Sequence, residues 1–135
     1  MAVVFADAIA QIQSMVKSLA LIKEAPSEPP ESANQFPFTI AYPGRGTFQF
    51  ETYGWGTGLN EIVLEVHFAR TNLPKAIRQA IPFHEQFLDL LIADPTLSGT
   101  VTTVNQVDYE FGQLEYASVQ TIGWLYTLRL KQLRS

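Results

Sequence analysis

The hydrophobic periodicity of the chain changes near residue 36, and this change limits the folds that the sequence can adopt. Within residues 3–23, apolar residues recur at alternating steps of four and three, which is the spacing of one buried face of an α-helix. From residue 36 onward, apolar and polar residues mostly alternate, as they do in strands with one buried face. The residues that form the helical stripe are Phe5, Ile9, Ile12, Val16 and Leu19.

A segment rich in proline and glutamate, residues 24–35, separates the two patterns. It contains three prolines, three glutamates and two serines, and this composition neither continues a helix nor fills a core. We expect an exposed connector, or a segment that orders only against a partner.

Alternating runs after residue 36 predict five strands, of which Leu59–Arg70 is the clearest. Pro43–Gly46 predicts the hairpin turn between the first two strands. Gly54–Gly58 predicts a glycine-rich loop that presents Trp55, and Gly112-Gln113 predicts a turn or a bulge. The predicted strands cover residues 36–42, 47–53, 59–70, 100–111 and 115–133.

Residues 72–92, between the third and fourth predicted strands, predict a second helix that Asp94-Pro95 ends. The element order is then α-β-β-β-α-β-β. Because helices do not alternate with single strands, we expect an α+β fold, with a mostly antiparallel sheet of about five strands and two helices packed on one face. The predicted apolar face of the second helix comprises Ile77, Ala80, Ile81, Phe87, Leu88 and Leu91.

The length of 135 residues predicts a single domain, residues 1–135. Apolar residues make up 47% and charged residues only 16% of the chain, so we expect part of the apolar surface to serve contacts with partners. The net charge of −4, with no basic cluster before Arg129, Lys131 and Arg134, argues against nucleic-acid binding. No export signal or bilayer-length apolar run is present, so we expect a cytoplasmic protein without a membrane partner.

Catalytic chemistry has little support in the residue pattern. The chain has no cysteine, which excludes disulfides and thiolate chemistry. A metal site would need His67 and His84 together with Glu65 or Glu85, and their spacing does not require one. Glu61 and Glu65 share one strand face, where a solvated pair is the simpler interpretation. We therefore expect no catalytic residue, no metal and no cofactor, in a protein that is not an enzyme.

Eight short segments carry a resemblance to a known group of proteins, and together they span roughly residues 36–130. They are Tyr42–Gly46, Glu65–Arg70, Asn72–Ala76, Pro82-Phe83, Phe87–Asp89, Ala93–Val101, Phe111–Tyr116 and Thr121–Trp124. These segments resemble small tail proteins of long-tailed phages. Within that group, the expected order of elements is similar to that of the tail terminator, or tail completion, proteins.

The resemblance implies a structural virion protein at the head-proximal end of the tail, assembled in the host cytoplasm. Such proteins form a homo-oligomer, a hexameric ring that caps the tail tube, fixes its length and joins the tail to the head–tail connector. The implied partners are the tail tube protein and the connector proteins, while DNA passes through the lumen without specific binding. A closed ring needs a heterologous interface, in which one patch meets a different patch on the next subunit.

The expected interface residues follow from expected exposure in loops and on the outer strand face, not from the resemblance. For Trp55, packing under its own loop is an equally good interpretation. Other virion roles remain open, namely a neck or head-completion adaptor or a tail tube subunit, as does a small ligand-binding domain or enzyme. The candidate interface residues are Arg45, Tyr53, Trp55, Glu65 and His67.

Overall fold

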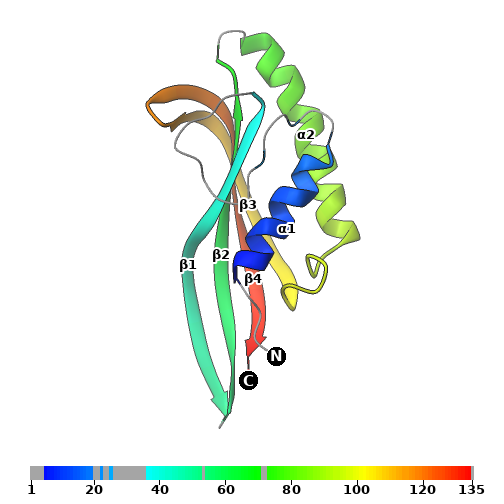
Figure 1. Cartoon of the computed structure of the whole chain (residues 1–135), viewed down its shortest axis with the longest axis vertical. Helices are drawn as coiled ribbons and strands as arrows, with labels where there is room; N and C mark the ends of the chain where they lie inside the picture. Colours follow the sequence, from blue (N-terminus) through cyan, green and yellow to red (C-terminus); the bar gives the residue numbers. More distant parts are fainter. Residues whose placement is uncertain are drawn as a thin grey trace.

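The computed structural model describes residues 5–19, 22, 25, 36–52, 54–70 and 73–134. Within this part of the chain, the four strands form one antiparallel sheet in the order β1-β2-β4-β3. Both helices lie on the same side of the sheet (Figure 1), so the predicted α+β fold is confirmed. The elements are α1 (Phe5–Lys17), β1 (Phe38–Thr52), β2 (Trp55–Phe68), α2 (Leu73–Ala93), β3 (Thr103–Tyr116) and β4 (Val119–Arg134).

The prediction of five strands in the order α-β-β-β-α-β-β is wrong, because the first two predicted strands are one. Pro43–Gly46, expected to be a hairpin turn, lies inside β1 as a shift of register against β2. Since β1 is an edge strand, the missing N–H of Pro43 need not cost a ladder hydrogen bond. The observed order is therefore α-β-β-α-β-β.

The expected glycine-rich loop at Gly54–Gly58 is largely strand, since β2 begins at Trp55. Gly54 has a φ of +93° and belongs to the turn. At Gly56, a Cβ atom would lie 2.5 Å from the ring of Phe48. Glycine is therefore needed here to let an aromatic ring cross the neighbouring strand, and not to form a loop.

The turn between β3 and β4 also lies later than the sequence predicts. Gly112 pairs with Gly123 inside the β3–β4 ladder, and the chain reverses at Ala117 and Ser118, both with positive φ. A Cβ on Gly123 would lie 1.7 Å from the carbonyl oxygen of Val66, so glycine permits a close approach of backbone there. In Figure 1 the end of the β3–β4 hairpin curls away from the plane of the sheet.

The helices bury a single core against one face of the sheet. The stripe of α1 packs on its own sheet, and Gln13 of α1 exchanges two hydrogen bonds with Thr39 of β1. From α2, Ala76, Ala80, Phe83, Phe87 and Leu91 are buried. Ile77 and Ile81, which were predicted on the same face, are exposed. Among the described residues, neither helix is long and apolar enough to cross a membrane.

The sheet extends well beyond the helices at one end, where β1 and β2 continue downward in Figure 1. We call this extension the arm and define it as residues 46–52 of β1, the turn residue Gly54, residues 55–60 of β2, and residues 131–134 of β4; the strand segments pair with each other. The rest of the sheet with its two helices is the body. The connector predicted at 24–35 lies outside the described residues, except for Ala25.

Candidate self-association surface

The helix side of the arm carries two exposed phenylalanines. Phe48 pairs with Gly58 and Phe50 with Gly56, so the two rings lie over strand positions without side chains. Their centroids are 5.0 Å apart in an edge-to-face arrangement, which is a favourable geometry for aromatic pairs. Phe50 is nevertheless 83% exposed, because neither α1 nor α2 reaches this part of the sheet (Figure 1).

The opposite side of the arm is also apolar. Trp55, Thr57 and Leu59 occupy every second position of β2, so their side chains share one face. Leu133 of β4 pairs with Thr57 and lies on the same face. Trp55 is 41% and Leu59 is 49% exposed, and Leu133 is similar. The arm therefore presents large apolar side chains on both faces, an unusual arrangement for surface that stays in water.

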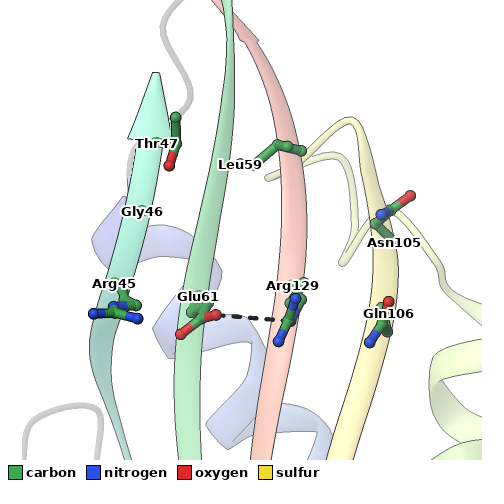
Figure 2. A pocket seen from close by; sticks show the side chains of 8 residues that line it. All are labelled: Arg45, Gly46, Thr47, Leu59, Glu61, Asn105, Gln106 and Arg129. Carbon is green, nitrogen blue, oxygen red and sulfur yellow. Dashed lines mark ion pairs between the residues drawn. The ribbon is translucent and has the colours of Figure 1, made fainter. Parts of the chain in front are cut away.

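A shallow polar hollow of about 590 Å³ crosses the second face of the sheet where the arm joins the body. Figure 2 shows a row of side chains across all four strands, from Arg45 through Glu61 and Arg129 to Gln106. Arg129 lies 3.1 Å from Asp108 and 3.7 Å from Glu61. Arg45 is exposed and makes no ion pair with any other described residue. The two arginines and the two carboxylates therefore balance in charge, and Arg45 is the member of the four without an ion pair to another described residue.

His67 is not at the surface, which corrects the expectation that it is exposed on the outer strand face. It is fully buried, and its ring contacts Phe38 and Tyr116 with centroids 5.8 Å and 5.9 Å away. Tyr116 comes from the end of β3, beside the curled hairpin. Alternation along β2 correctly separates the two faces, but it does not show that another hairpin covers one of them. At this end, the sheet is therefore buried on both faces.

Glu65 and His67 form a hydrogen-bonded chain with two hydroxyl groups. The His67 Nε2 atom lies 2.9 Å from Glu65 Oε1, Tyr42 donates its hydroxyl proton to the other carboxylate oxygen, and Thr121 contacts His67 Nδ1. Burial opposes ionisation of Glu65, but the hydrogen bonds from His67 and Tyr42 together place its pKa below the usual value. Burial and the neighbouring Glu65 raise the pKa of Tyr42. The network is thus a structural clamp between β1, β2 and β4.

The other histidine, His84, lies between α2 and the sheet. Its Nδ1 atom is 2.9 Å from the hydroxyl of Tyr126, and its ring lies 4.7 Å from Trp124 and 4.3 Å from Tyr109. Trp124 donates its indole proton to the carbonyl of Ala80. Across the described part of the chain, no three His, Cys, Asp or Glu residues come close enough to hold a metal ion. His84 therefore has packing partners on the sheet rather than a set of metal ligands.

The structure describes four of the five residues expected at an interface and places two of them at the arm and two in the body. Arg45 and Trp55 lie exposed, at the root of the arm and on the arm itself, and Tyr53 lies outside the described residues. Glu65 and His67 belong to the body. The interface candidates expected from the sequence did not include Phe48, Phe50, Leu59 and Leu133, all of which the structure exposes. The signal that was available is the glycine at alternate positions opposite the two phenylalanines.

Comparison with models of known protein families finds no match to this chain, and a search of curated proteins finds no sequence that matches it.

Proposed function

We propose that this protein is a structural virion component, a tail terminator whose copies join into a ring. The ring caps the tail tube, fixes its length and offers the surface to which the head–tail connector docks. The sequence resemblance motivates this proposal, and the two-faced apolar arm is the structural observation that supports it.

The arm carries enough apolar surface for a stable association. From their exposed fractions, Phe48, Phe50, Trp55, Leu59 and Leu133 together present roughly 500 Å² of apolar surface. A standard interface buries about 800 Å² on each partner, of which about 60% is apolar. One arm therefore supplies the apolar share of one subunit contact.

The hydrogen-bonded network of the body and the hollow beside the arm also agree with a structural role. The His67 and Glu65 side chains are tied to Tyr42 and Thr121 in the body, so they are already hydrogen-bonded where an enzyme would need groups that face a substrate. The hollow at the root of the arm carries Arg45, which is available for a carboxylate on a neighbouring subunit. Such a contact would fix the register of two subunits and add little to their affinity.

Negative-stain images of the purified protein distinguish a terminator from the other virion roles. We expect discrete rings, because a terminator closes on itself and stops. Long tubes would instead identify a tail tube subunit. When the protein is added during polymerisation of its tail tube protein, we expect shorter, capped tubes. A neck adaptor would leave the length of the tubes unchanged, and that result would contradict the terminator role.

A further inference from the structure

We propose that the arm of one copy inserts Phe50 into an apolar groove between α2 and β3 of the next copy. This inference rests on the proposed self-association and specifies the surface that receives the arm. It makes each subunit contact head-to-tail, with a projecting aromatic on one side and a groove on the other.

The groove has the size and composition of a receptor for an aromatic side chain. It has a volume of about 330 Å³ and lies where the end of α2, the following turn and the start of β3 meet. Ile92 at its edge is 78% exposed, although it lies beside other apolar groups. Asn105 and Gln106, at the start of β3, border the groove and the hollow on the opposite face alike. The apolar lining comprises Leu88, Leu91, Ile92, Pro95, Val104 and Val107.

The occupant is a second copy, because the arm and the groove belong to opposite edges of one sheet. Phe50 is on β1 and the groove is beside β3, and these are the two edge strands in the order β1-β2-β4-β3. In Figure 1 the tip of the β1–β2 hairpin lies at the lower end, away from the α2–β3 connection. A patch that fits a different patch on the same molecule generates a ring if the rotation closes, or a filament if it does not.

The chemistry of the two surfaces is compatible. Phe50, with Phe48 packed against its edge, is a rigid apolar projection that loses little conformational freedom on binding. Glu51, the exposed charged neighbour of Phe50, would stay in water at the rim, and no charged residue lines the groove itself. The contact therefore buries apolar surface without leaving an unpaired charge inside it.

The first test compares one substitution at two exposed positions of α2. Ile92→Glu places a charge at the groove, whereas Ile81→Glu, at a residue that is 55% exposed, places the same charge on the same helix away from it. We expect Ile92→Glu to weaken self-association at least about 30-fold, the loss of one interface anchor, and Ile81→Glu to leave it unchanged. Both variants should keep the thermal unfolding of the wild type. Equal association of the two variants would overturn the assignment of the groove.

The second test uses the absence of cysteine in the wild-type chain. Glu51→Cys marks the tip of the arm and Asn105→Cys marks the rim of the groove, and the two variants are co-expressed and treated with a short bis-maleimide. We expect crosslinked dimers from the mixture and none from either variant alone. Crosslinking of Glu51→Cys to itself would indicate an arm-to-arm contact and overturn the proposal.

The outcomes separate failure of the groove from failure of the proposed function. If the wild-type protein forms rings and the mixture gives no crosslink, the groove assignment is wrong and self-association stands. If the wild-type protein stays monomeric, the proposed function fails and the docking of the arm fails with it.

Discussion

The body and the arm are built from the same strands, yet only the body is buried. On the helix side of β1, Thr39 and Ala41 are buried in the body, whereas Phe48 and Phe50, on the same face of the same strand, are 43% and 83% exposed in the arm. The backbone ladder with β1 and β4 continues through both regions. Pairing of strands therefore does not distinguish the two regions, and coverage by side chains does.

Because of this difference in coverage, we expect folding to depend on the body and association to depend on the arm. Burial of the body supplies the hydrophobic stabilisation that folds one chain, and the arm contributes little to it because its large side chains stay in water. An exposed apolar surface of that kind on a monomer promotes association. We infer that residues of the body determine the stability of the subunit, and residues of the arm determine whether subunits join.

The largest effect is expected from truncating a side chain in the body. Phe87 is fully buried and packs with Phe83 and Tyr126 at centroid distances of 5.8 Å and 4.8 Å. Phe87→Ala should lower the free energy of unfolding by about 3–5 kcal/mol, since it removes a buried ring and leaves a cavity. Urea unfolding of a non-associating background such as Phe50→Ser measures this change. A loss below about 1 kcal/mol would show that the body is not the folding core.

Truncation of an arm residue should weaken association more than it lowers the free energy of unfolding. Trp55→Ala should weaken ring formation by about 2 kcal/mol, the usual effect of losing an interface aromatic, with a smaller change in subunit unfolding than Phe87→Ala causes. Sedimentation velocity at several concentrations gives the association constant. Val119→Ala, at an exposed residue on the β3–β4 hairpin, is the control and should associate as the wild type does. Unchanged association of Trp55→Ala would remove this residue from the interface.

The clamp in the body should give the subunit an acid-dependent stability. Because the pKa of Glu65 is lowered in the folded state, its contribution is complete above the ordinary glutamate pKa of about 4.3 and is lost as pH falls through the lower folded value. Glu65→Gln should cost about 2 kcal/mol at pH 7, since it weakens hydrogen bonds from two partners, and the difference from wild type should shrink in acid. Urea unfolding between pH 7 and pH 3 measures it. A difference that stays constant with pH would contradict the clamp.

The smallest effect is expected at the polar hollow. Arg129 is half exposed and pairs with Asp108 and Glu61, and exposed ion pairs typically contribute less than about 1 kcal/mol. Arg129→Gln should therefore change unfolding by less than that amount, and 0.5 M salt should remove most of the change. A loss of several kcal/mol in the same unfolding assay would mean that the hollow is part of the folding core.

Local patterns were sufficient to predict most of the fold. The periodicity of Ile9, Ile12 and Val16 predicted a helix that packs on the sheet, and the alternation along 62–68 separated the two faces of β2 correctly. The turns were misplaced because proline and glycine, which usually indicate turns, lie inside strands at Pro43–Gly46 and at Gly112. An edge position accommodates the first, and the pairing of Gly112 with Gly123 accommodates the second.

The candidate site was harder to predict because exposure is a property of the whole fold. Phe50 and Ile62 have similar local patterns, and only the extent of the helices decides that one is exposed and the other buried. His67 looked exposed because Tyr116, which covers it, is 49 residues away in the chain. Patterns in one strand contain no information about such distant coverage.

The most direct test of self-assembly through the arm is the molar mass of the protein in solution. Size exclusion with light scattering should be run on the wild type and on the double variant Phe50→Ser/Trp55→Ala. We expect one discrete mass for the wild type, that of a hexamer, and a folded monomer for the double variant. A wild-type protein that stays monomeric at all concentrations, or a double variant that keeps the wild-type mass, would contradict assembly through the arm.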